Sequence, residues 1–470
     1  MSSNNFCEES EDLIVVITPT SSKDRNGRFL GPILKREASR PNRPSRPVST
    51  AVTRFSFLED LKFIGWLPPQ NKWREWVNAM KPINAATWMT AGINDAIMNS
   101  VLNMHQNNSV IFWFAEKWSP KTNTFILPWG EITVTLEDVT VLGNFSVLGE
   151  PATCQVESLD EHAALNELYK AYRELVRSPS KKAVLSGWMK MFMGTHKVYE
   201  HEAFLTFWLS KYLFPSVKDT IVPETFHLAV LLARGRRIAL APAVLATLYR
   251  DLHLIQNAIL DLQERETKPD LHEVFAPMYY LQVWIWKRFP LVGPSETNNG
   301  DGTRLARWAG LDSRERKYGT LDSVTGKEHF VWRPYVEDAN HLFADTIYNE
   351  NESYRRIDNE ALDSFARCLR ISKLVGLDII QQYFPQRVCK QFGYDQDIPP
   401  YYVHLVDDED AWADYTTSLS DKTLYLPSRR FEGRVTARYE FWWGSGPVDP
   451  TGSRVPLPTK RQRRKRITAN

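Results

Sequence analysis

Residues 226–252 read FHLAVLLARGRRIALAPAVLATLYRDL, and this stretch decides the fold class. One apolar run extends from Phe226 to Ala233 and a second from Pro242 to Leu262, with the charged turn 234–237 between them. Apolar runs joined by a glycine-containing turn are typical of packed helices, and proline is favoured in the first turn of a helix. The sequence therefore predicts a helix pair near the middle of the chain.

Helical periodicity continues on both sides of this pair. One predicted helix has apolar residues at spacings of three and four, namely Trp73, Trp76, Val77 and Met80. Pro82 is expected to end this helix. Ser158 and Glu161 resemble a capping box that opens a long amphipathic helix ending near residue 178. Further helices are predicted over residues 93–104, 109–118, 204–211, 278–289, 360–375, 377–384 and 387–392.

The predicted β elements are short. Residues 124–127 and 131–134 flank Pro128-Trp129-Gly130, which indicates a hairpin whose glycine supplies an unusual backbone angle. Thr135 to Asp138 then resembles a second capping box, with Gly143 closing its helix. Residues 424–426 and 435–443 alternate like strands. The expected fold is mainly α, a large multi-helix domain with small β-hairpin elements over residues 71–445, in two packed subdomains that separate near residues 293–303.

Charge is distributed unevenly along the 470 residues. The net charge is +2, but residues 21–54 and 454–470 each carry +7 and residues 1–20 carry −4, so residues 55–450 carry −8. We expect residues 1–70, rich in Arg, Pro and Ser, and the basic tail 446–470 to be disordered. A basic run of this kind is typical of nuclear import or nucleic-acid contact, and we favour import. Its residues are Lys460, Arg461, Arg463, Arg464, Lys465 and Arg466.

Several classes of protein are excluded or disfavoured by composition. The absence of an apolar run of 18 residues excludes a spanning helix, and the acidic first dozen residues show no secretory signal. Four cysteines without a C-x-x-C pair argue against a disulfide framework and against a zinc site of usual spacing. The sequence thus favours a reduced, intracellular protein without a membrane partner.

Three carboxylates near the hairpin are candidates for a metal-dependent nucleic-acid enzyme. Asp95, Glu131 and Asp138 could together bind divalent ions, although a helix cap and a turn explain them more simply. Phosphate-binding loops, a zincin motif and a nucleophile elbow are absent from the sequence. No cofactor is therefore expected.

Three arginines precede the second helix of the central pair. Arg234, Arg236 and Arg237 lie just before a helix N-terminus, where an anion would be favoured. Pairing with acids of the acidic body is the alternative that we favour.

Several stretches resemble the plant mobile domain family, also called aminotransferase-like plant mobile domain or MAINTENANCE OF MERISTEMS-like proteins. The resemblance is carried by residues 118–151, by residues 226–252 and 281–290, by VWRPY at 331–335, and by residues 361–399 and 428–443. It implies a plant nuclear protein of transposable-element ancestry, similar to members linked to meristem maintenance, genome integrity and transposon silencing. It also implies that a phosphatase-like protein is a partner, and it transfers no catalytic residue to this chain.

Two functional hypotheses follow. The first is a non-enzymatic nuclear module whose acidic body binds a protein partner, with weak nucleic-acid contact through the basic tails. The alternative is a retained metal-dependent enzyme of the transposase or nuclease type, which requires Asp95, Glu131 and Asp138 to converge in one cleft. The sequence does not define the oligomeric state.

Overall fold

The computed structural model describes residues 7–10, 26–32, 34–35, 44, 60–66, 69–179, 181–265, 270–295, 297–298, 302–312, 321–338, 342–400, 406–420 and 422–444. The predicted import segment 460–466 lies outside these residues. Within the described part of the chain, no helix combines the length and apolar character that crossing a membrane requires.

The fold is mainly α, as the sequence predicts. The α-helices are α2 (Trp73–Ala91), α3 (Asn94–Asn99), α4 (Asn108–Glu116), α5 (Leu136–Gly143), α6 (Leu159–Arg177), α7 (Leu185–Phe192), α8 (Glu200–Trp208), α9 (Phe226–Ala233), α10 (Leu240–Arg265), α11 (Tyr279–Arg288), α12 (Ala344–Ile347), α13 (Glu360–Leu369), α14 (Ala411–Tyr415) and α15 (Ala437–Gly444). A π-helical turn, η2 (Leu209–Leu213), extends α8, and short 3₁₀ turns include η3 (Pro223–Thr225), η4 (Arg304–Trp308), η6 (Lys327–His329), η7 (Pro385–Arg387) and η8 (Cys389–Phe392).

The strands form small separate sheets. Antiparallel pairs are β1 (Cys7–Ser10) with β2 (Gly27–Leu30), β8 (Ser353–Arg356) with β11 (Thr423–Leu426), and β9 (Ser372–Val375) with β10 (Ile380–Tyr383). β3 (Lys62–Phe63) pairs in parallel with β7 (Glu273–Val274), and β4 (Trp118–Ser119), β5 (Thr124–Leu127) and β6 (Gly130–Ile132) make a three-stranded sheet. The predicted hairpin is confirmed, and Gly130 in its turn has a φ of +156°.

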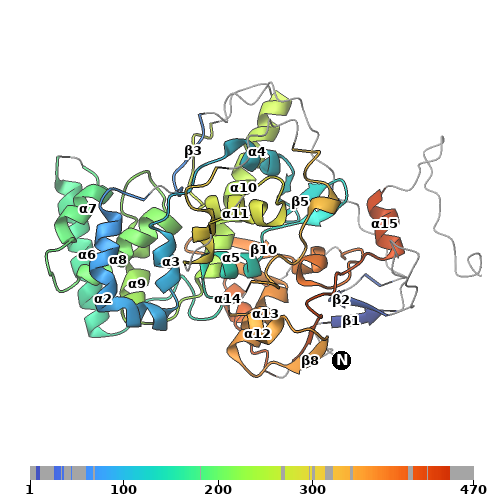
Figure 1. Ribbon diagram of the computed structural model, residues 1–470. Coiled ribbons are helices and arrows are strands. Elements are labelled where there is room, and N and C mark those ends of the chain that lie inside the picture. The colour runs from blue at the N-terminus through green and yellow to red at the C-terminus, as the bar shows by residue number, and fades with distance from the viewer. Residues whose placement is uncertain are drawn as a thin grey trace, which may run out of the picture.

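The helices gather in two regions of the molecule (Figure 1). Helices α2, α6, α7, α8 and α9 contact one another at one end, while α10 lies centrally and contacts α4 and α5. Two capping boxes begin their helices as predicted, at Thr135 with Asp138 and at Ser158 with Glu161. The predicted central pair therefore corresponds to α9 and α10, which connect the two regions.

One hydrophobic cluster runs through both regions. It includes residues from Leu30 to Leu426, among them Trp73, Trp284 and Leu424, all fully buried or nearly so. A smaller cluster joins Leu34, Ile126, Ile398, Tyr439, Trp442 and Trp443. Side chains before and after residues 293–303 share the large cluster, so this stretch does not divide the described chain into separate cores.

Proline 82 does not end its helix, contrary to the sequence prediction. Helix α2 continues from Trp73 through Pro82 to Ala91. Proline removes one backbone donor, which would have bonded the carbonyl of Asn78 four residues earlier. Pro82 and Asn78 both lie on the exposed face of α2, so water can reach that carbonyl.

Four predictions of secondary structure in the second half are wrong. The helix predicted over residues 360–375 ends at Leu369, and residues 372–375 form strand β9. Residues 377–384 contribute strand β10 instead of a helix, because Gly376 turns the chain back onto β9. The predicted helix 387–392 is two short 3₁₀ turns, interrupted at Val388 with φ −128° and ψ 35°. Residues 437–444 form helix α15 instead of a strand, and its aromatic residues pack at helical spacing into the smaller cluster.

Part of the N-terminal segment predicted to be disordered is ordered. Phe29 and Leu30 of β2 are buried, and the carboxylate of Asp395 accepts hydrogen bonds from the backbone N–H groups of Arg28 and Arg434, both at 2.9 Å. Residues 60–66 include β3, which aligns with β7. The prediction failed because tertiary partners far along the chain bury these short segments.

Candidate functional site

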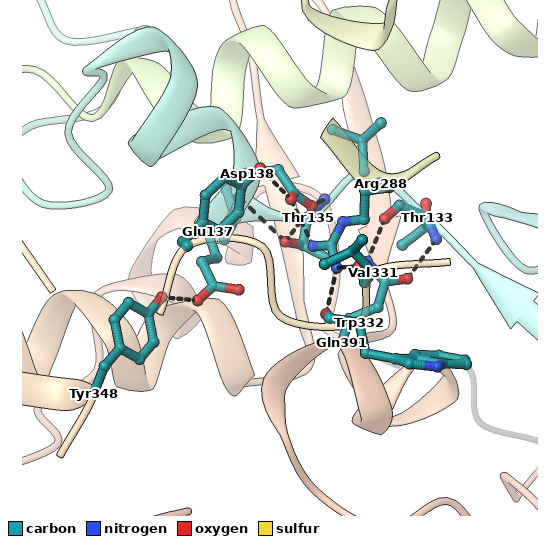
Figure 2. A network of polar contacts seen from close by, with 12 residues as sticks. Thr133, Thr135, Glu137, Asp138, Arg288, Val331, Trp332, Tyr348 and Gln391 are labelled. Atoms are coloured by element: carbon teal, nitrogen blue, oxygen red, sulfur yellow. Dashed lines mark hydrogen bonds and ion pairs between the residues drawn. The ribbon is translucent and has the colours of Figure 1, made fainter. Parts of the chain in front are cut away.

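A buried polar network surrounds Asp138, near the start of α5 (Figure 2). Asp138 Oδ2 accepts hydrogen bonds from the backbone N–H and the hydroxyl of Thr135, both at 2.8 Å. Its other oxygen, Oδ1, accepts from Arg288 Nη2 and from the Tyr335 hydroxyl, both at 2.7 Å. The Asp138 and Arg288 side chains have no exposed surface. The network therefore fixes α5, the end of α11 and residues 331–335 relative to one another.

Arg288 also forms hydrogen bonds with the backbone of Val331 and Trp332. Its Nη1 donates to the carbonyl of Trp332 at 2.5 Å, and its own carbonyl accepts from the Val331 N–H at 2.8 Å. Burying a guanidinium is favourable only when its donors are satisfied and a counter-charge is close. Asp138 supplies the counter-charge and these groups satisfy Nη1 and Nη2, while Nε is buried without a hydrogen-bond partner among the described residues.

Glu137 adds a second carboxyl to the network. The Tyr348 hydroxyl donates a hydrogen bond to Glu137 Oε1. Burial, followed by the charge of Asp138, raises the pKa of Glu137 to about 7, against the opposing effects of Tyr348, Arg288 and Arg333. Such a group suits acid–base chemistry only where a substrate reaches it, and Glu137 is 3% exposed. Its observed contact links α5 to Tyr348, directly after α12.

Thr133 and Gln391 extend the network toward the three-stranded sheet. Gln391 Oε1 accepts from the Thr133 N–H at 2.9 Å, and Gln391 Nε2 donates to the Thr133 carbonyl at 2.8 Å. One side-chain amide thus pairs with a whole peptide unit. This contact attaches η8 to the end of β6.

An open groove of about 620 Å³ lies beside this network. Its walls come from α11 and the loop after it, from η4, and from residues 331–334, which Arg288 positions from behind. Its lining residues are Trp286, Lys287, Pro290, Pro294, Ser295, Thr297, Arg307, Trp308, Val331 and Pro334. We call this feature the 286–334 groove. Its volume lies within the roughly 300–1,000 Å³ of ligand pockets.

The charged residues of the 286–334 groove meet at Asp338. Lys287 Nζ lies 2.7 Å from Asp338 Oδ2, and Arg307 Nη1 lies 3.1 Å from Asp338 Oδ1. Burial alone would raise the pKa of Asp338, but Lys287, Arg307 and Arg304 together lower it. Burial lowers the pKa of Arg304, and the charge of Arg307 lowers it further while Asp338 opposes them. The Asp338 carboxylate thus forms ion pairs with Lys287 and Arg307, and its charge also favours the protonated form of Arg304.

A smaller pocket encloses the amine of Lys390. Its lining includes Trp129, Lys327, Trp332 and Lys390, and Lys390 Nζ lies 3.6 Å from the centre of the Trp332 ring. Burial, followed by the charge of Lys327, lowers the pKa of Lys390 to about 7. The Trp332 face favours the charged amine but does not replace its lost hydration.

The three candidate metal-binding carboxylates each have their own partners. Asp95 Oδ2 accepts from Asn144 at 2.9 Å, and Glu131 accepts two hydrogen bonds from Arg387 at 2.9 Å. Asp138 binds Arg288 and Tyr335. In the described ranges, no group of three or more His, Cys, Asp or Glu side chains is placed to hold a metal ion.

The three candidate anion-binding arginines face carboxylates. Arg234 contacts Asp160 and Glu202, both at 2.6 Å, and Arg237 contacts Glu360 at 2.5 Å. Arg236 contacts two more acids, Glu150 at 2.7 Å and Glu161 at 3.4 Å. These pairs correspond to the alternative that the sequence favoured, in which the arginines bind acids of the body. An external anion would have to displace those acids.

Sequence reasoning did not identify the 286–334 groove. Trp286 is 1% exposed, and no sequence motif points to Lys287, Arg307 or Asp338. The lining comes from three separate segments, so no local spacing connects them. Two prolines soon after α11 are the only local signal, and they predict no more than a loop.

The comparisons with known proteins agree on one family. The sequence model of the plant mobile domain family matches residues 92–444. Among relatives from Arabidopsis thaliana, Serine/threonine-protein phosphatase 7 long form homolog is 26% identical over 62% of this chain and 22% of its own length. Protein MAINTENANCE OF MERISTEMS is 26% identical over 66% and 63%, and Protein MAIN-LIKE 1 is 24% identical over 63% and 56%.

These matches cover less than two thirds of the length of each relative. No solved structure matches the chain. The family match nevertheless spans most of the chain and contains α3 to α15, the buried network and the 286–334 groove. The chain belongs to the plant mobile domain family.

Proposed function

We propose that this chain is a non-enzymatic nuclear protein of transposable-element ancestry that acts as a protein-interaction module. The observation that carries the proposal is the 286–334 groove, an open surface lined by both polar and apolar residues and held in shape by a fully buried network. A preformed groove binds a partner with little ordering cost. The carboxylates that could have supported metal-dependent cleavage are instead bound to Asn144, Arg387 and Arg288.

The biological setting is proposed from the relatives. One relative is named for the maintenance of meristems, and a second is a MAIN-like protein. We propose a role in meristem maintenance, genome integrity or transposon silencing. The relative named as a phosphatase 7 homolog supports a phosphatase-like protein as the partner of this chain.

Affinity purification from plant nuclei tests the interaction function. The tagged chain would be recovered with and without nuclease treatment, and its partners identified by mass spectrometry. We expect a discrete protein partner that survives nuclease. Recovery only of proteins that nuclease removes would contradict the proposal and favour nucleic-acid binding through the basic segments.

Nuclear import is proposed for the basic run at residues 460–466. Deleting residues 454–470 from a fluorescent fusion should redistribute it to the cytoplasm while the circular dichroism of the purified chain stays unchanged. A matched control would replace the seven Lys and Arg residues of 21–43 with Gln. Unchanged nuclear accumulation after the tail deletion would contradict the import role.

A further inference from the structure

We infer that the 286–334 groove binds an extended, acidic peptide segment of the partner protein. This inference rests on the proposed interaction function and names the chemistry of its partner. Its first support is the local charge. Lys287 and Arg307 both contact Asp338, which leaves one positive charge in excess among these three residues.

This local excess has the opposite sign to its surroundings. Residues 55–450 carry a net charge of −8, so a positive cluster within them attracts a carboxylate that the remaining surface repels. Complementary charge of this kind increases association rate and specificity. Arg307 is 44% exposed at its side chain, so part of the cluster is accessible to a ligand.

The apolar walls favour a peptide over a nucleic acid. Trp286 is 1% exposed and Trp308 is 9% exposed, and their ring centres lie 5.8 Å apart, so each indole packs into the wall. Stacking of bases on an aromatic platform requires exposed ring faces. The lining instead includes Pro290, Pro294 and Pro334, whose apolar rings carry no backbone N–H donor and suit the side chains of an extended chain.

The groove is also rigid where the ligand would bind. Arg288 fixes Val331 and Trp332 from behind, and Asp138 fixes Arg288. Asp338 holds the Lys287 ammonium and the Arg307 guanidinium at one place. Binding therefore requires little rearrangement of the wall.

The test measures binding of the full chain to a fluorescein-labelled peptide of alternating Glu and Pro, by fluorescence polarisation. A Gln-Pro peptide of equal length is the neutral control, and the same peptide with phosphoserine in place of Glu compares phosphate with carboxylate. We expect the Glu-Pro peptide to bind at least about tenfold more tightly than the Gln-Pro peptide, with affinity falling as salt increases. Equal affinities for these two peptides would overturn the inference.

Variants locate the binding surface. Arg307→Gln should weaken Glu-Pro binding about threefold to fivefold, whereas Arg307→Lys should retain most of it. Thr297→Glu adds a negative charge at an exposed lining position without altering the Asp338 contacts, and should weaken binding even if Arg307→Gln fails to fold. Lys170→Gln, at a 71% exposed position on α6, is the matched control. Unchanged affinity in Thr297→Glu would contradict the inference.

Two further experiments distinguish failure of the inference about the groove from failure of the proposed interaction function. Labelled single-stranded RNA that binds the chain and loses affinity in Thr297→Glu would assign the groove to nucleic acid and overturn the inference. In the purification from nuclei, nuclease-resistant partners retained by Thr297→Glu would leave the interaction function intact but remove the groove from it. Absence of such partners from the wild-type chain would contradict the proposed function itself.

Discussion

At the scale of single residues, Glu137 and Lys390 are buried groups whose pKa values have moved toward neutrality from opposite sides. Each has a folded-state pKa of about 7, from ordinary values of 4.5 and 10.5. A shift caused by burial means that the charged form destabilises the fold. The two residues therefore predict opposite trends of stability with pH.

Replacing Glu137 with Gln should stabilise the protein in alkaline but not in acidic solution. Between pH 4.5 and about 7 the folded state keeps a proton that the unfolded state has released, so stability falls as pH rises and the full penalty applies above 7. We expect Glu137→Gln to raise the free energy of unfolding by about 1–2 kcal/mol near pH 8, with little change near pH 5. Urea denaturation at both pH values measures this.

Glu352 provides the control for this substitution. It is an exposed carboxylate that also accepts a hydrogen bond from a tyrosine, Tyr425. Glu352→Gln should give the same small effect at both pH values. A Glu137→Gln effect that does not vary with pH would contradict the assignment of its raised pKa to burial.

Replacing Lys390 with Met should stabilise the protein most at neutral pH and below. Between about pH 7 and 10.5 the unfolded state holds a proton that the folded state lacks, so wild-type stability rises with pH across this window. We expect a gain of about 1–2 kcal/mol near pH 7 that shrinks near pH 10, measured by urea denaturation. As a control, Lys373→Met should destabilise the protein, because this 8% exposed lysine is paired with Asp408. A lower free energy of unfolding for Lys390→Met at pH 7 would refute the prediction.

At the scale of elements, the sequence predicted where helices begin more accurately than it predicted whether a short segment is a helix or a strand. The capping boxes at Thr135 and Ser158 were predictable because both partners lie within four residues. Residues 377–384 and 435–443 were assigned wrongly because short apolar runs fit either period, and tertiary contacts decide between them. The 286–334 groove was not predictable, because its segments meet only in the folded chain.

The two capping boxes also allow a measurement of the buried ion pair. Asp138→Ala removes one half of the capping box of α5 and leaves Arg288 buried without its Asp138 counter-charge, so we expect a loss of about 3–5 kcal/mol in the free energy of unfolding. Glu161→Ala at the equivalent position of α6 should cost about 1–2 kcal/mol, since its contact with Arg236 is partly exposed. Equal losses by urea denaturation would show that Arg288 contributes little.

At the scale of the whole molecule, the arginines of the α9–α10 turn connect distant elements. Arg234 joins α6 and α8, Arg236 joins Glu150 to the start of α6, and Arg237 reaches α13. The turn thus links the α2, α6–α9 end of the molecule to the rest (Figure 1). The positive charges of this turn are therefore paired with carboxylates of the same chain.

These pairs should differ in their contribution according to burial. Arg234→Gln leaves the 4% exposed Glu202 without its cation, so we expect a loss of about 2 kcal/mol. Arg237→Gln breaks a pair whose side chains are 36% and 51% exposed, and should cost less than about 1 kcal/mol and depend more on salt. Urea denaturation at low and high salt compares the two; a larger loss for Arg237→Gln would contradict this ranking.

The hydrogen bonds that Asp395 accepts from Arg28 and Arg434 have a consequence for the order of events during synthesis. Arg28 and Asp395 are 367 positions apart in the chain. At roughly 5–20 residues per second, a ribosome makes Asp395 roughly 20–70 s after Arg28. Phe29 and Leu30 therefore leave the ribosome long before the residues that cover them exist. Throughout that interval, these apolar side chains are available to chaperones, and the contact between β2 and Asp395 can form only near the end of translation.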